Sequence, residues 1–555
     1  MSYLKRQSKQ RAPQSAPIPG SSQVPNSAGG FAWAVDDWAR LRRFLILGSE
    51  GGSYYAGEWK LTRENAEAVE RCLAADGERA VTEIVAISDA GRAPKNDPAI
   101  FALAMAAGLG DEPTRKAALE ALPRVCRTAT HLFQFATFVE GFRGWGRALR
   151  RAVGSWYARL SPDSLAYQAV KYRQRDGMTH RDVLRLAHPA ASVSSGNPTL
   201  ELTDEHRRLF EWIARGGSVE GLPRIVEGFT LVQSTESPAR AAELIREYGL
   251  PREAVPSELL GSAEVWDALL DDMPMTALVR NLATLTRVGV LEPGSDGAAR
   301  AVAQLGDAER IRAARVHPIA LLAALRTYAS GRGVRGQHSW TPLAQIVDAL
   351  DAAFYTAFEN VEPTGKRILL ALDVSGSMGG GFVAGVPSLS PRDASAALAL
   401  VTAATESRYE TVGFYAGKRG WKSGRTSRFS GRTDGLTSLA ISPRQRLDDA
   451  VRAVSGLPFG GTDCALPMLY ALDQERKVDT FVIYTDSETW AGDVHPAQAL
   501  ADYRRASGID ARLVVVGMVS NGFSIADPND PGMLDVVGFD TATPQLISDF
   551  ARGAL

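Results

Sequence analysis

One carboxylate and two hydroxyl groups stand at alternate positions, directly after the apolar run LLAL and close to several glycines, in Asp373, Ser375 and Ser377. Carboxylate and hydroxyl oxygens are hard ligands, and a turn that glycine permits brings residues two apart onto one concave face. The pattern predicts a site for a small cation such as Mg²⁺. By itself it also fits an ordinary turn at a strand end, which favours Asp, Ser and Gly.

Two further oxygen-bearing residues favour the metal site over the ordinary turn. Thr462 lies in the glycine-rich segment GGTDC, and Asp486 closes the apolar run TFVIYT. With the first three residues they complete a set of five oxygen ligands.

The motifs of common catalytic sites are missing from the sequence. An aspartyl nucleophile for phosphoryl transfer would require a second acid two residues on, where Ser375 stands. GRGVRGQ and PTGKR lack the complete phosphate-loop pattern, no serine lies in a GxSxG segment, and the histidines form no HExxH pair. We therefore predict that the protein is not an enzyme.

Continuous apolar segments alternate with helical ones in the C-terminal part of the chain. Segments 368–374, 480–486 and 512–518 are rich in β-branched residues, as are buried parallel strands of a doubly wound sheet. Ligands of such sheets bind at the carboxyl ends of the strands. Asp373 and Asp486 are therefore expected at one rim of the sheet.

The order of these residues in an α/β setting resembles the metal-ion-dependent adhesion site of von Willebrand factor A domains, which have a Rossmann-like fold. The resemblance implies a divalent cation, Mg²⁺ with Mn²⁺ as the alternative. It implies that Ser375, Ser377 and Thr462 coordinate the cation, that Asp373 and Asp486 assist, partly through water, and that an open position takes an acidic group from a partner. The alternative is a vestigial site, which keeps these residues but no longer binds a metal.

The domain organisation follows from changes in composition. Residues 1–30 are rich in Pro, Ser, Gln and Gly, carry four Lys or Arg and no acid, and are predicted to be a disordered basic tail. Residues 31–362 contain short amphipathic segments that end at Gly or Pro, which predicts many helices, stacked as a solenoid or packed without a repeat. Residues 363–555 form the α/β domain. The fold class is therefore α plus α/β, in several domains.

Whole-chain composition excludes several classes of protein. The 62 Lys and Arg balance 63 Asp and Glu, so any site for a polyanion must be a local patch. The three cysteines are far apart and suit a reducing compartment. No segment has the pattern of a signal peptide or a membrane span, and we predict a cytoplasmic protein without a membrane partner.

Basic charge is concentrated in residues 143–188, which hold ten Lys or Arg and three Asp, a local charge of +7. Helical spacing places several cations on shared faces: Arg147 with Arg151, Lys171 with Arg175, and Arg181 with Arg185 and His188. Such stripes on stacked helices could follow the phosphates of a nucleic acid. Charge alone equally fits helix faces that are only solvated or paired with acids.

The chain also resembles the Ro autoantigen family, the TROVE-domain RNA-binding proteins, from about residue 36 to the C-terminus. The likeness rests on segments in order, among them THLFQF, GWGRALRRAVGSWY, KYRQRDGMTHRDVLRLAHP, DAAFYTAFENVEPTGKR, GGTDCALPM and TDSETWAGDVHPA. It implies a ring of HEAT-like helical repeats closed by the von Willebrand domain. It further implies that small non-coding Y RNA binds outside the ring and single-stranded 3′ ends of misfolded RNA bind in its hole.

The family's basic surface for Y RNA corresponds to the residues that spacing singles out. Residue by residue, the resemblance assigns it to Lys171, Arg175, Arg181 and His188. Arg185 lies on the same stripe, and Arg147, Arg150 and Arg151 match through GWGRALRR, where a structural role is equally open. Met178 replaces an aromatic residue of the family.

We therefore expect a monomeric RNA-binding scaffold for small non-coding RNA and RNA quality control. The rival expectation is a protein-interaction module in which the metal binds an acidic partner and the helices are a platform. Both can hold together, with an exoribonuclease or another protein as partner of the metal site. A Gly- and Arg-rich insertion at 415–435 is either an extra RNA contact or a soluble loop.

Overall fold

The structure is a computed structural model, and it describes the following parts of the chain: residues 11–48, 66–175, 177–189, 192–194, 199–314, 316–333, 338–358, 361–380, 383, 389–416, 435–443, 445–455, 457, 460–519, 521–540 and 542–554. Most of the insertion at 415–435 lies outside these residues.

The first arm of the structure is a series of helices that pack mainly against helices one or two positions away in sequence. Several begin at a side chain that accepts a hydrogen bond from a free backbone N–H, as Asp36, Asp111 and Thr128 do. The helices of this arm are α2 (Asp37–Leu47), α3 (Glu67–Asp89), α4 (Asp97–Leu109), α5 (Glu112–Val125), α6 (Ala129–Phe142), α7 (Arg147–Ala158), α8 (Pro162–Lys171), α9 (His180–Ala187) and α10 (Asp204–Arg215).

The second arm continues the same architecture and shares its core with the α/β domain, because Phe354 and Ile368 belong to one apolar cluster. Its helices are α11 (Arg224–Gln233), α12 (Pro238–Tyr248), the 3-10 turns η2 (Arg252–Ala254) and η3 (Ser257–Gly261), α13 (Ala263–Asp271), α14 (Met275–Arg287), α15 (Asp296–Leu305), α16 (Ala308–Ala313), α17 (Pro318–Ala329) and α18 (Ala344–Thr356).

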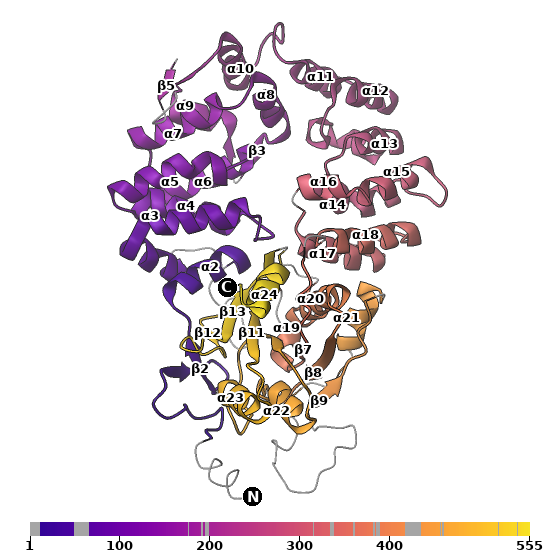
Figure 1. The fold of residues 1–555 in the computed structure, drawn as a ribbon. Helices are drawn as coiled ribbons and strands as arrows, with labels where there is room; N and C mark the ends of the chain where they lie inside the picture. The colour runs from indigo at the N-terminus through magenta and orange to yellow at the C-terminus, as the bar shows by residue number, and fades with distance from the viewer. Residues whose placement is uncertain are drawn as a thin grey trace, which may run out of the picture.

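The two arms and the C-terminal domain form a ring (Figure 1). The arms meet at α10 and α11, and the α/β domain lies between their other ends. Contacts that close this end include the His317 ring nitrogen Nε2, which lies 3.2 Å from the Arg92 carbonyl oxygen, and the pairs Arg92–Asp540 at 3.2 Å and Arg326–Asp393. The prediction of a helical ring closed by an α/β domain is confirmed.

The C-terminal domain is a six-stranded sheet of order β13-β11-β10-β7-β8-β9, parallel except for β9. Alternate residues of β7 enter different clusters, Leu370 with α20 and Leu369 with α23, so helices cover both faces. The elements are β7 (Ile368–Asp373), α19 (Gly376–Gly380), α20 (Pro391–Thr405), β8 (Tyr409–Phe414), β9 (Leu436–Ser438), α21 (Leu447–Ser455), α22 (Leu466–Asp473), β10 (Thr480–Thr485), α23 (Pro496–Ser507), β11 (Arg512–Gly517), β12 (Phe523–Ser524), β13 (Met533–Val537) and α24 (Ala542–Arg552).

The N-terminal segment corrects one prediction. Residues 11–30 are not a disordered tail: they cross the α/β domain, where β1 (Gln23–Pro25) pairs with β2 (Phe31–Ala34), which pairs with β12. Gln14 is fully buried. The segment is ordered by hydrogen bonds to residues more than 400 positions away in the chain. Its composition, which is poor in apolar residues, gives no sign of these bonds. Residues 1–10 lie outside the described part.

Two short hairpins complete the first arm, β3 (Gln174–Arg175) with β4 (Met178–Thr179), and β5 (Ser192–Ser194) with β6 (Thr199–Glu201). Within the described ranges, no helix is long and apolar enough to cross a bilayer.

Candidate functional site

The carboxyl ends of two neighbouring strands hold the aspartates of the predicted metal site. β7 and β10 are parallel neighbours with Leu372 opposite Tyr484, so Asp373 and Asp486 lie at one edge of the sheet. The Ser375 backbone N–H donates to Asp373 Oδ1 at 2.9 Å, and the Thr485 hydroxyl donates to Asp373 Oδ2 at 2.7 Å. These bonds fix the orientation of the Asp373 carboxylate.

The hydroxyl groups of the predicted site gather beside these aspartates. The oxygens Ser375 Oγ and Ser377 Oγ are 3.0 Å apart. The threonine comes from an adjoining loop. The Gly460 carbonyl of this loop accepts from the Gly376 backbone N–H at 3.4 Å, and the Thr462 carbonyl accepts from the Trp490 backbone N–H at 3.1 Å. The structure thus brings the five residues to one end of the sheet.

The electrostatics of this cluster fit a divalent cation. All five side chains are buried, and Thr462 Oγ1 and Asp486 Oδ2 have no hydrogen-bond partner. Burial, aided by the charge of Asp486, raises the pKa of Asp373 to about 7, and burial also raises the pKa of Asp486. A cation would neutralise this charge and satisfy both orphaned oxygens. Since the described residues contain no group of three His, Cys, Asp or Glu placed for a metal, the hydroxyls would be needed as ligands.

The sequence interpretation missed the residues that support this site from outside. Glu488 is buried, its pKa is raised to about 7 by burial and by Asp486, and its Oε2 accepts from the Ala28 N–H at 3.1 Å. Gln14 Nε2 donates to Asp463 Oδ1 at 2.7 Å and to the Val494 carbonyl at 2.8 Å. Glu488 could have been suspected from its place two residues after Asp486, whereas no sequence signal marks Gln14.

Replacing Gln14 with leucine is expected to destabilise the α/β domain by about 1–3 kcal/mol, because Asp463 and the Val494 carbonyl would stay buried without their donor. Thermal unfolding of the full chain measures the change. Ser15→Ala, at an exposed neighbouring position, is the control and should unfold like the wild type. An unchanged melting temperature for Gln14→Leu would show that the segment is only loosely attached.

The residues predicted to bind RNA lie mainly on α7 and α9, which pack against each other on the outer side of the first arm (Figure 1). Thr179 caps α9 in a capping box with Asp182. Val183 is buried, and the following five side chains, here called the arginine surface, are exposed: Arg147, Arg150, Arg151, Arg181 and Arg185.

Within the described parts of the chain, no acid pairs with any member of the arginine surface. Other arginines of the helical arms differ: Arg71 pairs with Asp37, Arg124 with Asp89, and Arg246 with Asp267 and Asp271. Unpaired guanidinium groups on neighbouring helices retain their donors for an anionic ligand.

Lys171 and Arg175 do not share a helix face, contrary to the expectation. α8 ends at Lys171, because Tyr172 leaves the helical conformation, and Arg175 lies in β3. Lys171 is half-buried, and its Nζ donates to the Tyr167 hydroxyl at 3.0 Å. Arg175 is exposed, and so is His188, which ends α9 in a left-handed conformation with φ 44°. The structure therefore separates Lys171 from the exposed stripe.

Family models match both parts of the chain in which these residues lie. The Ro60 vWA domain matches residues 367–551, and the TROVE domain matches residues 24–215 and 249–327. The chain is 42% identical over 533 residues to RNA-binding protein RO60 of Deinococcus radiodurans, covering 96% of each chain. It is 36% identical over 616 residues to RNA-binding protein RO60 of Caenorhabditis elegans, covering 98% of this chain and 92% of that one. The crystal structure of the RO (RSR) protein of D. radiodurans superposes with a TM-score of 0.69 at 41% identity, over 94% of this chain and 100% of that one.

Proposed function

The chain belongs to the Ro60 family of TROVE-domain proteins, and from this premise we propose that it is a non-enzymatic, cytoplasmic scaffold that binds small non-coding RNA of the Y type and single-stranded 3′ ends of misfolded RNA in RNA quality control. The observation that carries the proposal is the arginine surface, whose five exposed guanidinium groups have no acidic partner in the described structure.

Folded RNA would bind the arginine surface through its phosphates. The groove that side chains can reach in an RNA double helix carries little sequence information, so shape and charge dominate recognition. α7 and α9 contact each other, so these exposed arginines come from neighbouring helices of one arm. Arg175, in β3, and His188, at the end of α9, are exposed as well.

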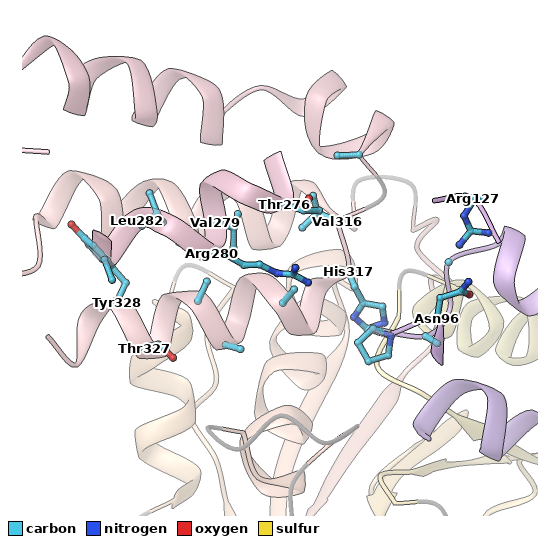
Figure 2. A pocket seen from close by; sticks show the side chains of 18 residues that line it. Asn96, Arg127, Thr276, Val279, Arg280, Leu282, Val316, His317, Thr327 and Tyr328 are labelled. Atoms are coloured by element: carbon cyan, nitrogen blue, oxygen red, sulfur yellow. The ribbon is translucent and has the colours of Figure 1, made fainter. Parts of the chain in front are cut away.

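A pocket at the closed end of the ring supports a site for a free RNA end. It has a volume of about 520 Å³ and lies between α14 and α17 of the second arm and the α3–α4 connection of the first. Figure 2 shows Arg280 and His317 beside it, with Asn96 and Arg127 on the opposite side. No acid lines it among the described residues. Arg280 is exposed and is not paired with an acid in the described ranges.

Hairpin RNAs that differ only in their tails test the proposal. We expect a hairpin with a short single-stranded 3′ tail to bind the purified protein more tightly than the blunt hairpin, and Arg280→Gln to reduce that advantage. Sequencing of RNA that copurifies from cells would identify the natural ligands. If neither hairpin binds, and no small RNA copurifies, the proposal is wrong.

The metal site supports an additional role in binding proteins. A bound Mg²⁺ or Mn²⁺ would be held by Ser375, Ser377 and Thr462 with the two aspartates, and it would offer a position for a carboxylate. Trp490, whose N–H donates to the Thr462 carbonyl, is 40% exposed, which is unusual for a large apolar side chain and suits a protein interface. An exoribonuclease is one candidate partner.

A further inference from the structure

A second pocket, of about 550 Å³, lies where the end of α8 and the β3–β4 hairpin meet α10 and α11. In Figure 1 these elements lie at the top of the ring, where the two arms join. The described residues that line it are Ala169, Arg173, Gln174, Thr179, His180, Arg181, Trp212, Ile213, Gly216 and Phe229. None of them is acidic.

One wall of this pocket is aromatic. The rings of Trp212 and Phe229 meet edge to face, with centroids 6.2 Å apart at 86°, and both side chains are only half-buried. The Arg173 guanidinium carbon lies 5.2 Å from the centroid of the Phe229 ring. Flat aromatic and guanidinium groups of this kind stack on nucleobases.

The rest of the rim offers hydrogen-bond donors. Arg173 and Arg181 are exposed, and neither pairs with an acid in the described chain. The Gln174 side-chain amide is exposed and makes no hydrogen bond to another described residue. The pocket thus combines a surface for stacking, two cations for a phosphate and an amide that can pair with the edge of a base.

We propose that this pocket binds one unpaired nucleotide of an RNA held by the arginine surface, with the base against Phe229, the phosphate at Arg173 and Arg181, and Gln174 at the base edge. Arg181 belongs to both the pocket and the arginine surface, so a single RNA can reach both without crossing the ring. The proposal rests on the proposed RNA binding and adds a site that distinguishes an unpaired nucleotide from a paired one.

Two duplex RNAs test the pocket. One contains a single unpaired uridine, and the other has an abasic residue at that position, so that phosphate charge is equal and only the base differs. Stacking of one base should make the wild-type protein bind the first RNA about 10-fold more tightly. Phe229→Leu keeps an apolar side chain and should bring the ratio of the two affinities close to one.

Two further variants separate the possible outcomes. Arg150→Gln, on the arginine surface but outside the pocket, should weaken the binding of both RNAs alike and keep the ratio of the two affinities. Crosslinking of 4-thiouridine at the unpaired position should label the peptides that contain Arg173 or Phe229. A wild-type ratio near one, or a ratio that Phe229→Leu does not change, would overturn the pocket assignment. Failure of the wild type to bind either RNA would instead overturn the proposed function.

Discussion

Changing Arg147, Arg150, Arg181 and Arg185 together to glutamine is expected to weaken the binding of a folded small RNA by about 100-fold or more at physiological salt. Each charged group can form a charge-assisted hydrogen bond to a phosphate, and four such contacts, discounted for exposure to solvent, are sufficient for this loss. Glutamine keeps a polar side chain, and the four positions are exposed, so the fold should be retained. Filter binding measures the change, and circular dichroism verifies the fold.

A matched control separates the site from the net charge of the protein. Arg71, Arg124, Arg240 and Arg246 are exposed arginines of the same helical arms, but each pairs with a carboxylate. Changing these four to glutamine alters the total charge equally and should reduce affinity by only about 2-fold to 3-fold, through the long-range field alone. Equal losses of RNA affinity in both quadruple variants would mean that any arginine of the ring contributes to RNA binding as much as those of the arginine surface.

Asp486→Asn is expected to have opposite effects on the protein with and without a divalent cation. Without metal, the substitution removes one of two neighbouring buried charges and should raise the melting temperature. With excess Mg²⁺ or Mn²⁺, the wild type should gain stability by mass action, about 2.7 kcal/mol at a concentration of 100 times Kd. The variant should lose most of that gain, because the unpartnered Oδ2 is the oxygen left for a cation or its water.

Asp540→Asn is the control for this experiment. Asp540 is also a buried carboxylate of the α/β domain, but it pairs with Arg92 and not with the metal site. This variant should be destabilised and should still be stabilised by the cation. If Asp486→Asn keeps the full cation-induced shift in melting temperature, the residues do not form a metal site.

The sheet and its rim were predictable because they depend on local patterns. β7, β10 and β11 coincide with the apolar segments to within a residue at their ends, and parallel strands necessarily bring Asp373 and Asp486 to the same edge. The start of α9 was predictable for a similar reason, since the Thr179 capping box is contained in four consecutive residues.

The features that escaped prediction depend on distant parts of the chain. Gln14 is ordered by Asp463 and Thr489, which no short sequence window contains. The wall of the second pocket combines Arg173, from the connection between α8 and β3, with Phe229 of α11. Spacing placed the cations of the arginine surface on a face, but only the three-dimensional arrangement shows which arginines lack an acidic partner.

Helix ends were the weakest part of the prediction. Helical spacing places Lys171 and Arg175 on one face only if the helix continues as far as Arg175. Instead, α8 ends at Lys171, and from Tyr172 the chain turns into the β3–β4 hairpin. Lys171 then packs between Tyr167 and Tyr172, with its ammonium 5.2 and 5.4 Å from the two ring centroids. A tyrosine pair that binds a cation in this way looks the same in sequence as a pair that faces solvent.

The salt dependence of RNA binding tests most directly the claim that the arginine surface binds phosphates. The slope of log Kobs against log salt concentration should be shallower by about 3 in the variant with glutamine at positions 147, 150, 181 and 185, since each lost phosphate contact removes about 0.7–0.9 from the slope. A variant that binds RNA with the wild-type slope, at whatever affinity, would contradict the account.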